Sequence, residues 1–133
     1  MAEMQLNILS PAKVVAKTKA THVLVPGIEG YLGILPGHTR FVTEMATGEL
    51  AVDEGSTRQV YFVSGGYVEV IDDVVTVLAD VIEKPSDIDA QRAEKAKARA
   101  LDRLNQRAGV DVLRAQAALN RATKRLAVSA ARR

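Results

Sequence analysis

Apolar and polar residues follow two different periods along this 133-residue chain, and the change falls near residue 85. Before it, short runs rich in Val, Ile, Leu and Thr alternate with turn residues such as Ser10-Pro11 and Asp72-Asp73. Runs of this kind, broken by Gly, Pro and Asp, are typical of β-strands joined by short turns. No helical pattern of ten residues separates them, so we expect hairpin connections and mostly antiparallel pairing.

The apolar runs of this first part are too many for one flat sheet. They are the segments MQLNIL, KVVAKTKA, HVLVP, LGIL, ELAV, RQVYFV, GYVEVI and VVTVLA, with a turn expected at Ser64-Gly65-Gly66 between RQVYFV and GYVEVI. A flat sheet of so many strands would expose an apolar face, whereas two packed sheets bury it. The pattern therefore predicts a β-sandwich or flattened barrel over residues 1–85.

Residues 86–133 contain no proline and a single glycine, Gly109, and are dominated by the helix formers Ala, Arg, Lys, Leu and Gln. Their pattern predicts one helix from about Asp87 to Gln106 and a second from about Asp111 to Ala130. We expect Gly109 to end the first helix and Asp111 to cap the second. The short link makes an antiparallel hairpin, and the whole chain is predicted to be α+β.

The predicted inner faces of the hairpin are built mostly from alanine. The first helix presents Ala93, Ala96, Ala100, Leu104 and Ala108, and the second presents Val112, Ala115, Leu119, Ala122 and Leu126. Burying a Leu or Val side chain contributes roughly 1.5–3 kcal/mol, and an Ala much less. We therefore expect the hairpin to be marginal alone and to depend on a ligand or on docking, as a conformational switch requires.

Charge divides the chain in the same place. Residues 1–86 carry six Lys/Arg and eleven Asp/Glu, a net charge of −5, whereas residues 87–133 carry twelve and five, a net charge of +7. The basic part contains no aromatic residue on which a base could stack, which argues against nucleic acid. The basic residues are then either a solvated helix face or a surface for an acidic protein partner. One hypothesis from these features is a β-sandwich adaptor whose basic helices bind an acidic protein or nucleic acid.

Several features that the sequence lacks limit the compartment and the chemistry expected of this protein. There is no cysteine, no leader pattern and no apolar run of 18 residues, so we expect a soluble protein of a cytoplasm-like space. His22 and His38 lie in no triad or metal motif, and Ser64 lacks the G-x-S-x-G elbow. The glycines of residues 27–33 are not followed by the GK[ST] of a phosphate loop. The sequence predicts neither catalytic residues nor a metal site.

The segment DIDAQRA, residues 87–93, opens the first predicted helix. Ser86 and Asp89 fit the S-x-x-[DE] capping box, and acids at this end suit the helix dipole. Asp89 and Arg92 are three residues apart and are expected to pair weakly. Taken alone, these residues predict a helix start.

Longer stretches resemble a known family. The segments EGYLGILPGHTRFVTEMATGEL and VYFVSGGYVEVIDDVVTVLAD, together with the basic helical tail, resemble the epsilon subunit of bacterial F-type ATP synthases. The resemblance implies a non-catalytic central-stalk subunit of a proton-translocating enzyme, peripheral to the cytoplasmic face of the bacterial inner membrane. Its implied partners are the gamma subunit, the c-ring and the catalytic alpha/beta subunits. The resemblance also implies that Glu29, Gly30, Tyr31 and Leu32 dock on the c-ring and that His38 and Thr39 contact gamma.

The resemblance also implies regulation by the hairpin. In similar proteins the hairpin is either folded or extended into the catalytic head, where it blocks ATP hydrolysis. Its basic residues then meet an acidic stretch of the catalytic subunit; here they are Arg114, Arg121, Lys124 and Arg125.

Some members of the family bind ATP on the folded hairpin through a motif I/L-D-x-x-R-A, which Ile88, Asp89, Arg92 and Ala93 match. The further ligand contacts implied by the resemblance are Glu83, Arg99, Arg121 and Arg125. No cofactor is required, and ATP is expected as a regulatory ligand. Arginines suit phosphate oxygens, Asp89 is expected to hold Arg92, and Glu83 to accept from the adenine amine.

Overall fold

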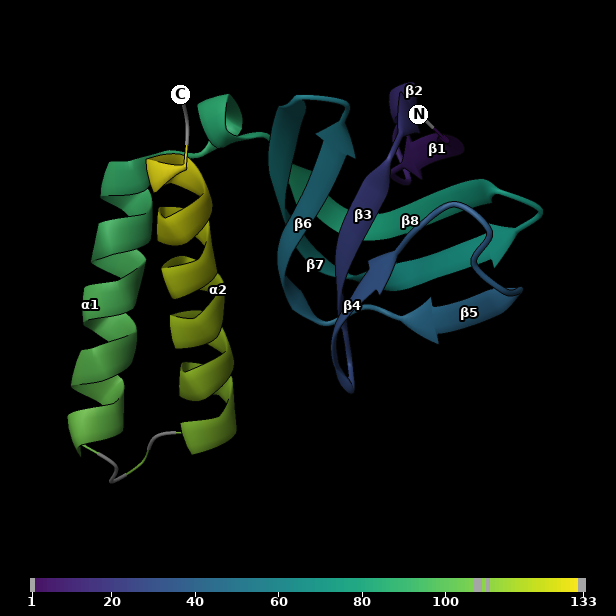
Figure 1. Ribbon diagram of the computed structural model, residues 1–133. Helices are drawn as coiled ribbons and strands as arrows, with labels where there is room; N and C mark the ends of the chain where they lie inside the picture. The colour runs from purple at the N-terminus through teal and green to yellow at the C-terminus, as the bar shows by residue number, and fades with distance from the viewer. Residues whose placement is uncertain (1, 107–108, 110, 132–133) are drawn as a thin grey trace. The chain divides into compact units, whose positions relative to one another are not determined.

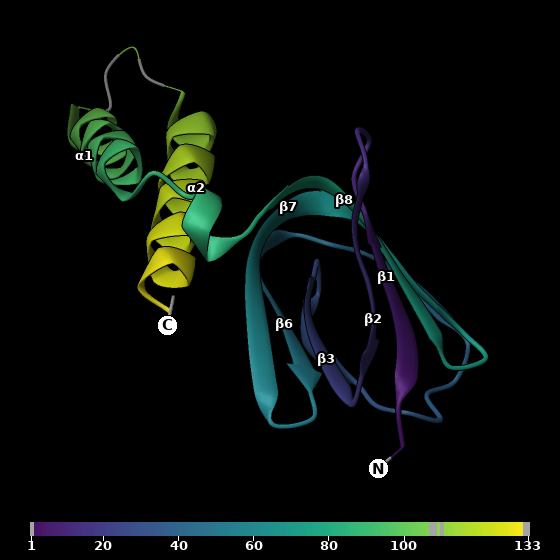
Figure 2. The same ribbon diagram turned by 90° about the horizontal axis from the view of Figure 1, so that it is seen from above.

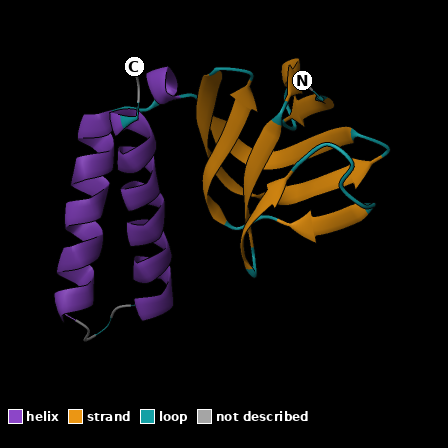
Figure 3. Cartoon of the chain, in the orientation of Figure 1, coloured by secondary structure: helices purple, strands orange, loops and turns teal. Residues whose placement is uncertain are grey.

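The computed structural model describes residues 2–106, 109 and 111–131 (Figure 1). The chain divides into two compact units, Met1–Ile82 and Glu83–Arg133, the first built from strands and the second from helices (Figure 3).

The first unit is a β-sandwich, as the sequence predicted. Its strands are β1 (Met4–Leu9), β2 (Val14–Ala20), β3 (His22–Gly27), β4 (Gly30–Ile34), β5 (Phe41–Glu44), β6 (Thr47–Glu54), β7 (Thr57–Ile71) and β8 (Val74–Glu83). They follow the order β2-β1-β8-β7-β6-β3-β4, and β5 pairs with β7. β1 runs parallel to β8, while the pairs β1–β2, β3–β4, β3–β6, β5–β7 and β6–β7 are antiparallel. Figure 2 shows the strands curling around a common interior.

Alternate residues of β1 and β8 fill that interior. In β1, Leu6 and Ile8 are fully buried, and they lie beside the fully buried Val75 and Val77 of the neighbouring β8. The core is almost entirely aliphatic, with Val, Leu and Ile from both layers. Burial of one face of β1 and of β8 fixes the register, because a shift of one residue would turn the apolar set outward.

β7 corrects the sequence interpretation. The segments RQVYFV and GYVEVI were expected to be two strands separated by a turn at Ser64-Gly65-Gly66, but they form one strand of 15 residues. Gly65 and Gly66 have φ angles of +77° and +112°, so they bend the strand instead of reversing it. β6 pairs with the strand before the glycines and β5 with the strand after them. The short strand β5 was not predicted.

The first helix also begins later than expected. Residues Pro85–Asp87 form a 3-10 turn, and α1 runs from Ala90 to Gln106. The cap is Asp89 instead of Ser86, because Ile88 between them is extended and buried and therefore stands outside the helix. The Asp89 carboxylate accepts from the Arg92 main-chain nitrogen at 3.0 Å, and the Asp89 carbonyl accepts from the Ala93 nitrogen at 3.0 Å.

The second helix, α2, runs from Val112 to Ala130 and is capped as predicted. The Asp111 carboxylate accepts from the Arg114 main-chain nitrogen at 3.0 Å. Gly109 has a φ of +70°, the left-handed conformation expected of a glycine after a helix. The inner faces are also as predicted, since Ala93 and Ala100 of α1 and Ala115 and Ala122 of α2 are buried. Val112 is an exception, because its side chain is exposed, and Ala108 lies outside the described residues.

Neither helix, over the residues that the structure describes, combines the length and the apolar character needed to cross a bilayer.

Candidate functional site

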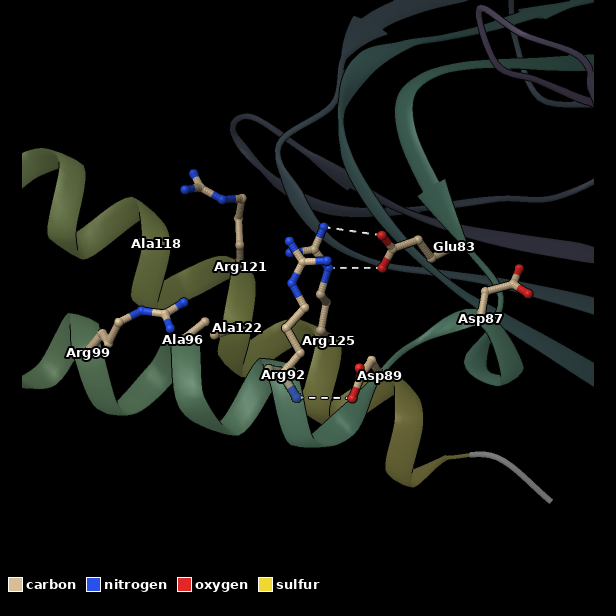
Figure 4. A pocket seen from close by; sticks show the side chains of 11 residues that line it. Glu83, Asp87, Asp89, Arg92, Ala96, Arg99, Ala118, Arg121, Ala122 and Arg125 are labelled. Atoms are coloured by element: carbon tan, nitrogen blue, oxygen red, sulfur yellow. Dashed lines mark hydrogen bonds and ion pairs between the residues drawn. The ribbon is translucent and has the colours of Figure 1, made fainter.

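A cavity of about 370 Å³ opens between the two helices near the start of α1 (Figure 4). Its charged lining consists of four arginines and three carboxylates, and its apolar lining of alanines: Glu83, Asp87, Asp89, Arg92, Arg99, Arg121, Arg125, Ala93, Ala96, Ala118 and Ala122. All of these residues belong to the second unit. Because the residues between the helices are small, the longer arginine side chains surround an open volume.

Helical spacing explains why the arginines converge. Arg92 and Arg99 are seven residues apart on α1, and Arg121 and Arg125 are four apart on α2, so each pair lies on one face of its helix. The antiparallel packing of the helices turns the two faces toward the same cavity (Figure 4). The cavity therefore exists only while the hairpin is folded.

One arginine of the cavity is bound to a carboxylate. Arg125 donates from Nε to Oε1 of Glu83 at 2.9 Å and from Nη2 to Oε2 at 3.2 Å. This is the two-pronged geometry that best suits a guanidinium and a carboxylate. The side chains are 31% and 28% exposed, so solvent partly screens the pair.

The other three arginines keep their charge uncompensated at short range. Within the described residues, no carboxylate lies at ion-pair distance from the guanidinium of Arg92, Arg99 or Arg121. Asp89 holds Arg92 at its main-chain nitrogen, and not at the guanidinium as the spacing suggested. Three convergent guanidinium groups make the cavity attractive to an anion with several oxygens.

Seven of the eight residues selected from the sequence for ATP binding line this cavity. The eighth, Ile88, is only 9% exposed and lies just before the Asp89 cap. Sequence reasoning did not select Asp87, Ala96, Ala118 or Ala122, which also line the cavity. The regular placement of alanine on both helices was the available signal for the three alanines.

The segment selected for c-ring docking begins in the turn between β3 and β4, at Glu29, and continues into β4. Tyr31 is 49% exposed, but its hydroxyl oxygen accepts from the main-chain nitrogen of Glu49 at 2.9 Å, which fixes the ring. Leu32 turns inward and packs against the core. Glu29 and Gly30 are exposed, together with Ile28, which was not selected.

The residues selected for gamma contact lie in the loop between β4 and β5. The His38 main-chain nitrogen donates to the Leu35 carbonyl at 3.1 Å, closing a turn in which Gly37 has a φ of +84°. The His38 ring meets Phe41 edge-on, with centroids 5.5 Å apart, and its Nδ1 lies 2.8 Å from the Thr39 carbonyl oxygen. Thr39 is exposed and His38 half-buried.

The residues selected for the basic arm all lie on α2, and two of the four also line the cavity. Arg114 is exposed, and Lys124 is half-buried outside the cavity lining. Arg121 and Arg125 line the cavity.

Comparison with known proteins decides the family. Residues 3–85 match the model "ATP synthase, Delta/Epsilon chain, beta-sandwich domain", and residues 86–130 match "ATP synthase, Delta/Epsilon chain, long alpha-helix domain". The chain belongs to the ATP synthase delta/epsilon family. It is 44% identical over 125 residues to the ATP synthase epsilon chain of Desulforapulum autotrophicum, covering 92% of this chain and 93% of that one.

Solved structures share the fold of this epsilon-family chain. A chain in the cryo-EM structure of Euglena gracilis mitochondrial ATP synthase superposes with a TM-score of 0.83 at 23% identity, over 99% of this chain and 83% of that one. A chain in the Tetrahymena thermophila mitochondrial ATP synthase structure gives 0.62 at 15% identity, over 98% and 96%. The resemblance drawn from the sequence is thereby confirmed. Membership makes the chain a non-catalytic subunit of the rotary ATP synthase, and it favours this interpretation over a free-standing adaptor.

Proposed function

We propose that the chain is the central-stalk subunit that couples the c-ring to the catalytic head of a proton-translocating ATP synthase, and that its hairpin inhibits ATP hydrolysis when it extends. We further propose that ATP binds the folded hairpin and restrains it. The observation that carries the regulatory part is the cavity in which the guanidinium groups of Arg92, Arg99 and Arg121 converge, with no carboxylate of the described residues at ion-pair distance.

The cavity suits a nucleotide in size and charge. At about 370 Å³ it lies within the ~300–1,000 Å³ of small-molecule sites. The guanidinium groups supply several donors for a triphosphate, and the exposed cap at Asp89 leaves the cavity open to solvent. Glu83 is expected to accept from the adenine amine, which requires it to exchange at least one of its bonds to Arg125.

Binding at such a site stabilises the folded hairpin. A ligand that binds only one form stabilises it by RT ln(1 + [L]/Kd), so a millimolar site responds over the range of cellular ATP. This contribution is large relative to the stability of the hairpin itself, because the two helices bury few large side chains against each other.

The inhibitory state uses some of the same side chains. Arg121 and Arg125 line the ATP cavity in the folded form and belong to the basic arm of the extended form. Their charges, with Arg114 and Lys124, give an acidic stretch of the catalytic subunit a complementary surface. ATP binding and inhibition therefore compete for the same arginines, and the two states exclude each other.

The docking role rests on the β-sandwich. The β3–β4 turn and the start of β4, which expose Ile28 and Tyr31, are proposed to contact the c-ring, and the loop that carries His38 and Thr39 to contact gamma. The similar chains belong to assemblies described as "OSCP/F1/c-ring" for Euglena and "central stalk/cring" for Tetrahymena, which supports a central-stalk role in general, while the contacts of individual residues stay part of the proposal.

The ATP proposal is tested by titrating the isolated chain with ATP to about 10 mM, roughly ten times the Kd of a millimolar site, while melting temperature and amide shifts are followed. We expect a saturable rise in melting temperature that Arg92→Ala removes. Arg103→Ala is the matched control, because Arg103 is an exposed arginine of α1 outside this cavity. No response of the native chain, or an equal response of Arg92→Ala, contradicts ATP binding.

The inhibitory role is tested separately in the assembled enzyme. Removal of residues 88–133 is expected to raise ATP hydrolysis, since the arm is absent. Unchanged hydrolysis would contradict inhibition and would leave the coupling role in place. Co-purification of the full-length chain with gamma and the catalytic head tests that coupling role directly.

A further inference from the structure

We propose that Asp73 is a positioning residue, whose carboxylate fixes the loop of residues 35–40 in the conformation that docks on the partner subunit. The inference rests on the proposed function, which assigns a subunit contact to His38 and Thr39. The sequence marks Asp73 only as a turn residue, and its link to the loop follows from the tertiary structure.

The geometry joins three segments at one residue. The main-chain nitrogen of Gly37 donates to Oδ1 of Asp73 at 2.7 Å, across 36 residues of sequence. The main-chain nitrogen of Gln5 donates to the Asp73 carbonyl at 2.9 Å, which ties the same turn to β1. Both views of the fold show the loop between β4 and β5 running beside the turn that joins β7 and β8 (Figures 1 and 2).

The carboxylate is the loop's side-chain link to the rest of the β-sandwich. Among the described residues, no other side-chain hydrogen bond connects residues 35–40 to another segment, since the His38 Nδ1 contact stays within the loop. A main-chain N–H donating to a carboxylate is charge-assisted and short, and it holds Gly37 at the centre of the turn between Leu35 and His38. Losing it leaves the middle of the loop without an anchor.

At the position of Asp73, the backbone conformation of the turn favours glycine over aspartate. Asp72 and Asp73 have φ angles of +48° and +60°, as a two-residue hairpin turn with positive φ at both positions requires. Glycine adopts this conformation without the steric cost of a side chain and is the preferred second residue of such turns. Aspartate tolerates this conformation, so the turn accepts Asp73, and what distinguishes Asp73 from Asp72 is the hydrogen bond from Gly37.

The loop presents the proposed contact residues in a fixed arrangement. Leu35 is 56% exposed, Thr39 is exposed, and the His38 ring is set against Phe41 at the start of β5. Val42, the next residue of β5, is 62% exposed beside them. Holding such a loop in its docking conformation before binding lowers the entropy lost on association.

The experiment compares three variants of the turn. Asp73→Gly keeps, or improves, the backbone fit of the turn but removes the acceptor, and Asp73→Asn keeps an acceptor oxygen. Asp72→Gly is the matched control, because Asp72 has the same backbone conformation and no hydrogen bond to the loop is recorded for its side chain. The readouts are amide hydrogen exchange at Gly37 and the affinity of each variant for ATP synthase stripped of this subunit.

We expect Asp73→Gly to fold with an unchanged or higher melting temperature, to exchange the Gly37 amide faster, and to bind the stripped enzyme about three- to tenfold more weakly, the effect of one lost hydrogen bond. Asp73→Asn should fall between it and the native chain, and Asp72→Gly should match the native chain in both readouts.

Three outcomes overturn the positioning role. They are native exchange at Gly37 in Asp73→Gly, faster exchange with native affinity, and an equal effect of Asp72→Gly, which would assign the effect to the turn backbone. The docking assignment itself is tested by Thr39→Arg, which adds bulk to an exposed position of the loop. If Thr39→Arg binds normally while Asp73→Gly binds weakly, the contact assigned to Thr39 is wrong and the positioning by Asp73 stands.

Discussion

Arg125 on α2 and Glu83 at the end of β8 bind each other through two parallel hydrogen bonds, across 42 residues of sequence. The pair ties the second helix of the hairpin to the segment that precedes the first. A partly exposed pair of this kind contributes up to about 1 kcal/mol. Its larger consequence is that Glu83 accepts hydrogen bonds that the Arg125 guanidinium could otherwise donate to phosphate oxygens in the cavity.

Glu83→Gln is predicted to strengthen the binding of inorganic tripolyphosphate to the isolated chain by about three- to tenfold, because it weakens the contact to Arg125 and removes a negative charge from the cavity. Calorimetric titration measures the change. Glu94→Gln, which changes an exposed carboxylate of α1 outside the cavity, is the control and should bind as the native chain does. Equal affinities for all three proteins would show that Glu83 does not compete with the ligand.

Asp89 allows helix capping to be separated from ligand binding. Asp89→Ala is expected to destabilise the start of α1 by about 0.5–2 kcal/mol, because the Arg92 main-chain nitrogen loses its acceptor. Asp89→Asn retains an acceptor and should keep most of that stability, which amide hydrogen exchange at residues 92–93 measures. If both variants lose protection equally, the charge of Asp89, and not its capping oxygen, stabilises the helix.

The alanine interface is predicted to be intolerant of bulk. Ala100→Leu places a larger side chain where Ala100 is 2% exposed, and overpacking of this kind costs about 1–3 kcal/mol. We expect the helices to separate, the melting response to ATP to disappear, and inhibition in the assembled enzyme to increase. Ala98→Leu, on the exposed side of the same helix, should leave all three properties unchanged. A native response to ATP in Ala100→Leu would contradict the dependence of the cavity on helix packing.

The β-sandwich contains a pH-dependent contact at Asp53. Hydrogen bonds from Arg58 at 2.8 and 3.2 Å lower the pKa of this carboxyl below its ordinary value of 3.8, the charge of Arg58 and the nearby His22 ring add to the shift, and partial burial opposes it. A lowered folded-state pKa means that the contribution to stability is full above about pH 4 and is lost as the pH falls through the folded-state value.

Asp53→Asn should therefore reduce stability by up to about 1 kcal/mol at pH 7 and by much less near pH 2. Thermal unfolding at the two pH values measures the difference. Asp80→Asn is the control, since it removes an exposed carboxylate that has no recorded ion pair among the described residues. A loss of the same size at both pH values would show that the Arg58 contact contributes nothing to acid unfolding.

The sequence predicted the elements better than their boundaries. Runs rich in β-forming residues identified most strands, but they could not show that Gly65 and Gly66 bend one long strand, because two glycines in a β-pattern equally suit a turn. The capping box predicted Ser86 as the helix cap, whereas Asp89 takes that position in the structure. This difference depends on the burial of Ile88, which is a property of the folded unit.

The sequence by itself determined the two-part architecture and the alanine faces of the hairpin, because periodicity is a local property of a chain. The family and the set of arginines came from the resemblance of its segments to the epsilon family. The tertiary structure alone decided that Glu83 binds Arg125, that Asp73 holds Gly37, and that the arginines enclose a cavity. Each of these contacts joins residues tens of positions apart. Only the packing of whole elements brings such atoms within hydrogen-bonding distance.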